Sequence, residues 1–155
     1  KGICIKNIQI LVIALSSPLI VGIYDENGEF VEQISSEEKS DVSLIKIMDE
    51  ILNGGKFNLQ KIIYANGPGS FMGVKVAYVV LKTISIVKEC EFYAVSGFEL
   101  NGGAPIRANK NLSFVDTPEG IKLQKAQAGE FGLPQNLAVL NLNLDTLPNY
   151  VIQAV

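Results

Sequence analysis

The sequence predicts a mixed α/β domain in which three successive strands precede two helix–strand units. Three observations support this prediction. Apolar runs of strand length open the chain, beginning with Ile8–Leu15. Asp25-Glu26-Asn27-Gly28 is a strong hairpin signal. Two later segments, residues 40–53 and 71–88, repeat apolar residues with helical spacing. The element order is therefore β-β-β-α-β-α-β, with the last strands added in parallel through helical crossovers.

The first three strands follow from local patterns. Ile8–Leu15 is nearly continuous in apolar residues, as expected of a strand that is buried on both faces. Ser16-Ser17-Pro18 marks a turn, and Leu19–Tyr24 is a second β-rich run. After the hairpin signal, Glu29–Ser35 mixes apolar and polar residues, which is typical of a half-exposed strand. We expect these three strands to pair antiparallel in sequence order.

The first helix is expected to begin with a cap at Ser40 or Asp41. It should end at about Asn53, because Gly54-Gly55 follows. Its apolar side comprises Leu44, Ile47, Met48, Ile51 and Leu52.

The second helix, Phe71–Lys88, is expected between the short strands Lys61–Ala65 and Glu91–Val95. Beyond this point the patterns weaken, so we divide the chain into a first lobe, residues 1–97, and a short second lobe, residues 98–155. After Ser96 we expect a helical turn at Gly97–Asn101, a hairpin of Leu112–Val115 with Ile121–Leu123, and a loop at Ala126–Pro134. Two further strands are expected at Asn136–Leu142 and Tyr150–Val155.

Composition limits the function. The 155 residues carry a net charge of −3, and their positive mean hydropathy indicates a globular protein with extensively buried segments. The basic residues are scattered, whereas a protein that holds nucleic acid by itself usually shows a basic stripe. We therefore expect any contact with nucleic acid to run through a partner protein.

The types of residue present exclude several kinds of site. Histidine is absent, which rules out Ser-His-Asp and Cys-His catalysis and every His-containing zinc site. Cys4 and Cys90 lie far apart and are expected to be reduced, buried thiols. No acidic cluster has the spacing of a calcium loop. We expect no catalytic residue, no metal and no cofactor.

The chain also lacks the usual signals for export or membrane insertion. Lys1–Cys4 shows no feature of a signal peptide. The longest apolar stretch, Ile8–Ile23, is interrupted by polar residues and by Pro18 and Gly22. We therefore expect a cytoplasmic protein with no membrane partner.

A glycine-rich turn follows the strand at Lys61–Ala65 and opens the second helix. It contains Gly67, Pro68, Gly69, Ser70, Phe71 and Gly73. Its spacing misses both the dinucleotide fingerprint and the P-loop. Gly67 and Gly69 would permit positive φ, and Ser70 can cap the helix. The turn either offers helix amides to an anion or is a tightly packed structural turn, and the sequence favours the structural turn.

The stretch from Ile62 to Lys75 reads Ile-Ile-Tyr-Ala-Asn-Gly-Pro-Gly-Ser-Phe-Met-Gly-Val-Lys. It resembles the signature of the TsaB (YeaZ) family, a strand followed by Gly-x-Gly-Pro-Gly-Ser-Phe-Thr-Gly-Val-Arg and a long apolar helix. Tyr93-Ala94-Val95-Ser96 resembles the family's strand that ends in Val-Ser, and Ile106-Arg107-Ala108 sits where the family has Ile-Asp-Ala. The resemblance extends from about Ile8 to Val115.

The resemblance implies an actin-like (RNase H-like) ATPase lobe that has lost catalytic function, followed by a truncated second lobe. It implies a non-catalytic subunit of the machinery that puts threonylcarbamoyl on a tRNA adenosine. The implied partners are the larger paralogue TsaD, which binds nucleotide and performs the transfer, and the small ATPase TsaE. The subunit would contact tRNA only indirectly, and a homodimer would compete with the heterodimer.

Some positions depart from the family's pattern. Leu15-Ser16-Ser17 stands where the family usually has Asp-Thr-Ser, and active members of this fold hold phosphate and metal at that hairpin. The missing carboxylate favours a protein that does not bind or hydrolyse ATP. In the glycine turn, Ala65, Met72 and Lys75 replace the family's first Gly, its Thr and its Arg.

Three other functions stay open. An active ATP-dependent phospho- or carbamoyltransferase of the same fold would need a carboxylate near the phosphates, but Asp25, Asp116 and Asp145 lie in turns without supporting motifs. A protease, an activity once proposed for relatives, would lack both histidine and a Ser-Lys motif. The third is a structural or regulatory homodimer unconnected with tRNA.

The second helix has more apolar surface than one sheet-facing side requires. The face expected to cover the sheet comprises Ala77, Val80, Leu81, Ile84 and Val87. A polar stripe comprises Lys75, Lys82 and Glu89, and an apolar stripe between the two comprises Met72, Val79 and Ile86. Either the first helix covers the apolar stripe or another chain does. With the resemblance, we expect a partner interface made by the apolar stripe together with Lys75 and Lys82.

Overall fold

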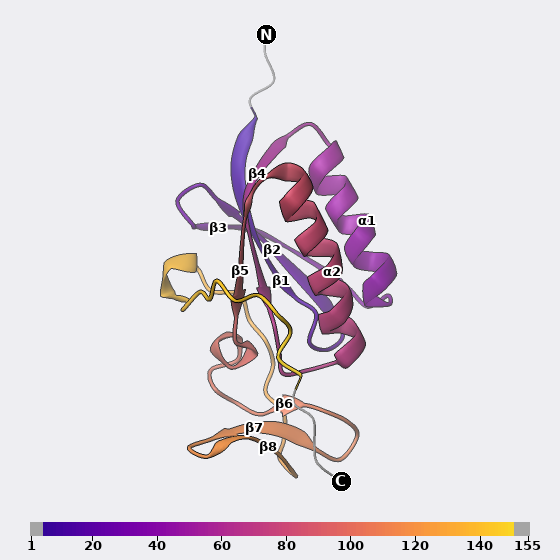
Figure 1. The fold of residues 1–155 in the computed structure, drawn as a ribbon, viewed down its shortest axis with the longest axis vertical. Coiled ribbons are helices and arrows are strands. Elements are labelled where there is room, and N and C mark those ends of the chain that lie inside the picture. The colour runs from indigo at the N-terminus through magenta and orange to yellow at the C-terminus, as the bar shows by residue number, and fades with distance from the viewer. Residues whose placement is uncertain (1–4, 151–155) are drawn as a thin grey trace.

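The structure is a computed structural model that describes residues 5–150 (Figure 1). Five strands form one mixed sheet in the order β3-β2-β1-β4-β5. The elements of this part are β1 (Lys6–Ile13), β2 (Leu19–Asp25), β3 (Phe30–Ser36), α1 (Ser40–Asn53), β4 (Phe57–Ala65), α2 (Phe71–Lys88) and β5 (Glu91–Val95). The predicted order β-β-β-α-β-α-β is confirmed. The predictions for Cys4 and for residues 151–155 of the last strand lie outside the described residues.

The central strand of the sheet is β1, which pairs antiparallel with β2 and parallel with β4. Leu11, for example, pairs with Gly22 on one side and with Ile63 on the other. From Ile8 onward β1 is buried, as its continuous apolar sequence predicts. Because β1 offers backbone partners along its whole length, β4 begins at Phe57 and not at Lys61 as predicted.

Both long helices lie on the same side of the sheet, with α1 beside α2 (Figure 1). The apolar side predicted for α1 faces the core, where Leu44, Ile47, Met48 and Ile51 are buried. The predicted cap at Ser40 or Asp41 is wrong. Lys39 holds the N-cap position without a side-chain bond, because the first helical bond runs from Ser43 N to Lys39 O (3.0 Å).

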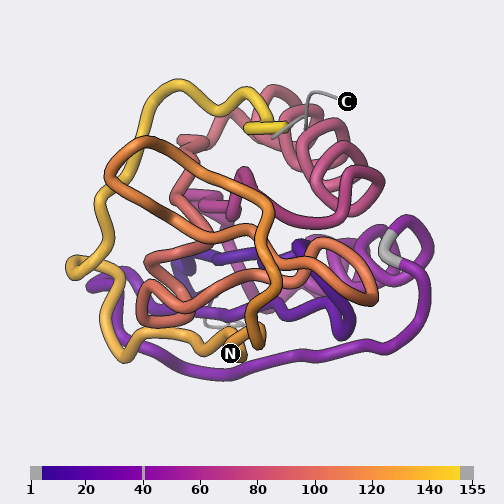
Figure 2. Tube along the Cα trace, turned by 90° about the horizontal axis from the view of Figure 1, so that it is seen from below, coloured from indigo at the N-terminus to yellow at the C-terminus, as the bar shows by residue number. Residues whose placement is uncertain are grey.

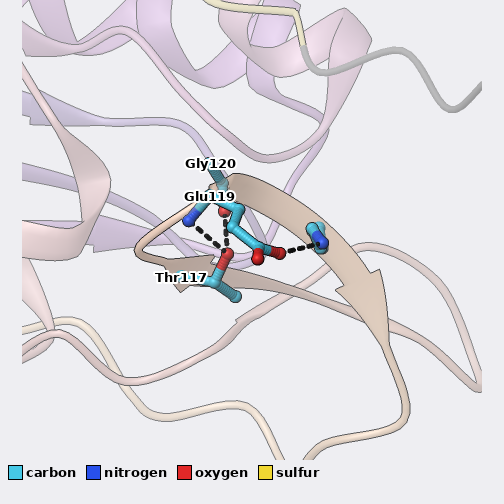
Figure 3. Close-up of polar contacts among 4 residues, drawn as sticks. Thr117, Glu119 and Gly120 are labelled. Atoms are coloured by element: carbon cyan, nitrogen blue, oxygen red, sulfur yellow. Dashed lines mark hydrogen bonds and ion pairs between the residues drawn. The ribbon is translucent and has the colours of Figure 1, made fainter.

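A second, three-stranded antiparallel sheet contains β6 (Ile106–Arg107), β7 (Ser113–Thr117) and β8 (Gly120–Gln124). The hairpin of β7 and β8 was predicted, whereas β6, with only two residues, was not. The hairpin turn is closed by side chains (Figure 3). Thr117 Oγ1 donates to Gly120 O (2.6 Å) and accepts from Glu119 N (3.2 Å). Lys122 Nζ donates to Glu119 Oε1 (2.7 Å), so this turn is held independently of the first sheet.

The chain then returns to the first sheet through residues 133–149, which we call the C-terminal segment. Figure 2 shows it running along one side of the molecule. It makes isolated bridges at two places, Glu29 with Asn136 and Ala94 with Asn143. The strand predicted at Asn136–Leu142 is wrong, because Asn136 Oδ1 accepts from Ala138 N (2.8 Å) and starts the 3₁₀ turn η2 (Leu137–Val139). The helical turn predicted after β5 is confirmed as η1 (Gly97–Leu100).

The C-terminal segment therefore belongs spatially to the first sheet, although it follows the second sheet in sequence. Tyr24, buried in β2, donates from its hydroxyl to Pro134 O (2.7 Å). Leu133 lies so close to Gly22 that a Cβ there would approach Leu133 Cδ1 to 2.9 Å. The division of the chain at residue 97 stays a prediction.

Candidate functional site

The glycine-rich turn joins the ends of three strands. Its backbone is held by hydrogen bonds from Asn66 N to Val95 O (3.1 Å) and from Ser70 N to Leu15 O (2.8 Å). Gly97 N, just beyond β5, donates to Gly67 O (2.9 Å). The predicted N-cap is confirmed, because Ser70 Oγ accepts from Gly73 N (3.1 Å). The turn therefore sets where α2 begins relative to the ends of β1 and β5.

The three glycines of the turn each lie against a different part of the protein. Gly67 has φ +135°, and a Cβ there would lie 2.5 Å from Asn149 O. A Cβ at Gly69 would lie 2.6 Å from Leu15 Cβ, and one at Gly73 would collide with Ala14 O. The positive φ expected at Gly69 is wrong, and this glycine is needed instead for its close approach to Leu15.

The space beside these glycines is filled by the protein's own backbone and side chains. Gly67 and Pro68 are buried. The amide of Gly73 is already bound to Ser70 Oγ, and the amide of Val74 donates to Ser70 O (2.9 Å). This arrangement suits a packed strand-to-helix turn better than an open anion site.

The outward face of α2 exposes the predicted apolar stripe. The exposed fractions are 62% for Met72, 54% for Val79 and 65% for Ile86, so α1 does not cover them. Lys75 and Lys82, which flank the stripe, are also exposed. The structure thus places all five residues of the predicted partner interface on the surface of one helix.

One residue of the predicted sheet-facing side is misplaced. Val87 is 71% exposed, and the prediction that it faces the sheet is wrong. Ser85 is buried near the same end of the helix, and its Oγ donates to Lys82 O (2.7 Å). At the other end, Phe71 is also exposed and packs against Tyr150 with 4.6 Å between ring centroids. The apolar surface is therefore broader than the predicted stripe.

The sequence reasoning missed the contacts between the turn and the C-terminal segment. Asn149 N donates to Asn66 O (2.7 Å), and Asn66 Nδ2 donates to Leu147 O (3.2 Å). The hydroxyl of Tyr64, one residue before the end of β4, donates to Thr146 O. Burial raises the pKa of the Tyr64 hydroxyl above its ordinary value. These contacts join residues about eighty positions apart, and no local pattern signals them.

The end of β1 is apolar at the position where the sequence resemblance implies a carboxylate in active members of the fold. Leu15, just beyond β1, is 1% exposed and lies against Gly69. Within residues 5–150, no three His, Cys, Asp or Glu side chains gather so as to hold a metal ion. In the same part of the chain, no helix combines the length and hydropathy that crossing a bilayer requires.

Comparisons with known proteins identify the fold. Neither a protein-family model nor a curated protein matches the chain. Among solved structures, YeaZ from Pseudomonas aeruginosa superposes with a TM-score of 0.57 at 16% identity, over 86% of this chain and 73% of that protein. An uncharacterized protein described as similar to peptidase YEAZ from the same organism superposes with a TM-score of 0.53 at 16% identity, over 77% of this chain and 64% of that one. The chain shares its fold with YeaZ, and the fold implied by the sequence resemblance is confirmed.

Proposed function

We propose that the chain belongs to the TsaB (YeaZ) family and is a non-catalytic scaffold subunit. It binds and supports a TsaD-type threonylcarbamoyltransferase that forms threonylcarbamoyladenosine on tRNA. Two observations support the family: the motif from Gly67 to Gly73, and the fold shared with YeaZ. A TsaE-type ATPase is the expected third component. The protein acts in the cytoplasm and contacts tRNA only through its partners.

The observation that carries the proposal is the exposed apolar stripe on α2. Met72, Val79 and Ile86 are seven residues apart, so they form a ridge about 21 Å long on one side of the helix. Lys75 and Lys82 run beside it. A protein interface typically has an apolar centre and a polar rim, and this surface provides both. The lysines fit a partner surface with acidic residues at its edge.

The double substitution Val79→Glu with Ile86→Glu tests the interface. Both side chains are exposed, so the variant should fold, and circular dichroism checks this. Mixed with a TsaD-type protein from the same organism, the wild type should elute as a heterodimer in size-exclusion chromatography with light scattering. The variant should elute as a separate species, because two carboxylates would replace apolar side chains at the centre of the interface, where binding would remove them from water.

A matched control introduces the same charges elsewhere. Val31 in β3 and Val139 in η2 are 54% and 68% exposed, respectively. Val31→Glu with Val139→Glu should therefore bind the TsaD-type protein as the wild type does. Loss of binding in both double variants would indicate a general effect of charge, and retained binding in the α2 variant would place the interface elsewhere.

The same stripe supports a homodimer as the second candidate. In that case the wild type alone should form a concentration-dependent dimer that the α2 variant abolishes. A dimer that excludes the TsaD-type protein at every mixing ratio would favour the homodimer function over the scaffold.

A further inference from the structure

A cavity of about 450 Å³ lies between the turn that joins β1 to β2, strand β6 and the loop before the C-terminal segment. Ser16 and Ser17 line it from the turn, Arg107 from β6, and Glu130 and Phe131 from the loop. Binding sites for small molecules commonly have volumes of about 300–1,000 Å³, so the cavity is large enough for one. It is separate from the exposed face of α2.

The cavity is lined by one basic side chain, Arg107, and one acidic side chain, Glu130, which do not form an ion pair with each other. Among residues 5–150, Lys122 with Glu119 is the only ion pair, so Arg107 and Glu130 are not bonded to one another. Arg107 Nη1 donates to Asn109 O (3.2 Å) and to Lys110 O (3.5 Å), and both bonds engage that one nitrogen of the guanidinium. Nε and Nη2 can therefore donate to a carboxylate in the paired geometry that guanidinium favours.

The remaining lining is partly apolar. Pro18, Ile20 and Phe131 contribute carbon surface, and the Ser16 and Ser17 hydroxyls contribute hydrogen-bonding groups. A phosphate or a nucleotide would bring several negative charges close to Glu130, with Arg107 as the only cation in the lining. A ligand with one charge of each sign and an apolar side chain would satisfy both charged residues and the carbon surface.

We infer that this cavity binds a small zwitterion of the free α-amino acid class, with its carboxylate at Arg107, its ammonium group at Glu130 and an apolar side chain against Phe131. The charges of ligand and site then cancel pairwise. Ser16 and Ser17 provide hydrogen bonds at the rim. This ligand site would work alongside the proposed scaffold role and does not depend on it.

Titration calorimetry with leucine and two analogues tests the inference on the unchanged protein. Isocaproate is leucine without its ammonium group, and isopentylamine is leucine without its carboxylate. Leucine should bind saturably at millimolar concentration, and each analogue should bind about tenfold more weakly, because each leaves one charged residue without its partner. Inorganic phosphate should bind more weakly than leucine.

Two substitutions test which residue binds the carboxylate of the ligand and which binds its ammonium group. Arg107→Gln should weaken leucine about tenfold but leave isopentylamine unchanged, because that amine makes no use of the guanidinium. Glu130→Gln should weaken leucine and leave isocaproate at least as tightly bound. Lys110→Gln and Glu119→Gln change the same charges outside the cavity lining and should bind leucine as the wild type does.

Three results would overturn the inference. They are the absence of saturable leucine binding, phosphate binding tighter than leucine, and equal affinity for leucine and its two analogues. The analogue series uses only the wild type, so it tests the amino-acid site even if a variant fails to fold.

Discussion

The carbonyl oxygen of Asn149 lies directly against Gly67, on the side where any other residue would carry its Cβ. A Cβ at Gly67 would lie 2.5 Å from this oxygen, and Gly67 has a φ of +135°. The backbone amide of Asn149 also donates to the carbonyl of Asn66. The C-terminal segment therefore completes the glycine-rich turn and with it the start of α2, the helix that exposes the apolar stripe.

Substitution of Gly67 by alanine should reduce stability in two ways, through backbone strain and through collision with Asn149. We expect Gly67→Ala to lower the free energy of unfolding by roughly 2–4 kcal/mol in urea denaturation. Gly120 is the control, since it has φ +115° but nothing within 4 Å of an added Cβ. Gly120→Ala should lose only the stability that backbone strain costs, about 1 kcal/mol. Equal losses in the two variants would contradict the contact with Asn149.

Gly73 tests the contact between α2 and the end of β1. Alanine is a better helix former than glycine by about 1 kcal/mol, so helix propensity alone predicts that Gly73→Ala stabilises the protein. A Cβ at Gly73 would collide with Ala14 O, and we therefore expect a net loss of about 1–3 kcal/mol. Thr83→Ala, at an exposed site in the same helix, should change stability little. A stabilised Gly73→Ala variant would show that α2 can shift away from β1 at low cost.

Tyr64 should make stability depend on pH in the alkaline range. Its hydroxyl donates to Thr146 O, so Tyr64→Phe should cost about 1 kcal/mol at neutral pH. Burial raises the pKa of folded Tyr64 above its ordinary value of 10.0, so the unfolded chain ionises first and is stabilised as pH rises. The advantage of the wild type over Tyr64→Phe is complete below pH 10 and should shrink above it. Guanidinium titrations at several pH values measure this, and a constant or growing difference would contradict it.

Much of the fold could be predicted because its signals are local. The hairpin at Asp25–Gly28, the apolar run in β1 and the helical periodicity of residues 71–88 each specify one element through neighbouring residues. Ser70 was predicted as a helix cap for the same reason. Strand β6 was not predicted, because a two-residue strand has no period and depends on its partner β7.

The C-terminal segment could not be predicted, because its conformation depends on distant partners. The apolar run Leu137-Ala138-Val139-Leu140 is compatible with a strand. In the structure Asn136 caps a 3₁₀ turn there, and the backbone meets other strands only at single bridges. Its anchoring at Tyr64 and Gly67 spans about eighty residues. The sequence does show that α2 has more apolar surface than its sheet-facing side requires, because the apolar positions cover a wide arc of one helix. Whether α1 or solvent faces that arc depends on helix packing.

The isolated protein should not bind ATP. Leu15 provides no side-chain oxygen at the end of β1, and the cavity beside Ser16 and Ser17 contains Glu130, which disfavours phosphates. Calorimetry with Mg-ATP at millimolar nucleotide should show no saturable heat. A dissociation constant in the low micromolar range would instead support an active transferase.

Reconstitution of the tRNA modification tests the scaffold function most directly. The assay combines tRNA, a TsaD-type enzyme, a TsaE-type ATPase and an activated threonylcarbamoyl donor, and it quantifies threonylcarbamoyladenosine in the digested tRNA by mass spectrometry. We expect product with the wild-type chain, and little product without it or with Val79→Glu and Ile86→Glu combined. The control variant with Val31→Glu and Val139→Glu should support full activity. Equal amounts of product with and without the chain would contradict the scaffold function.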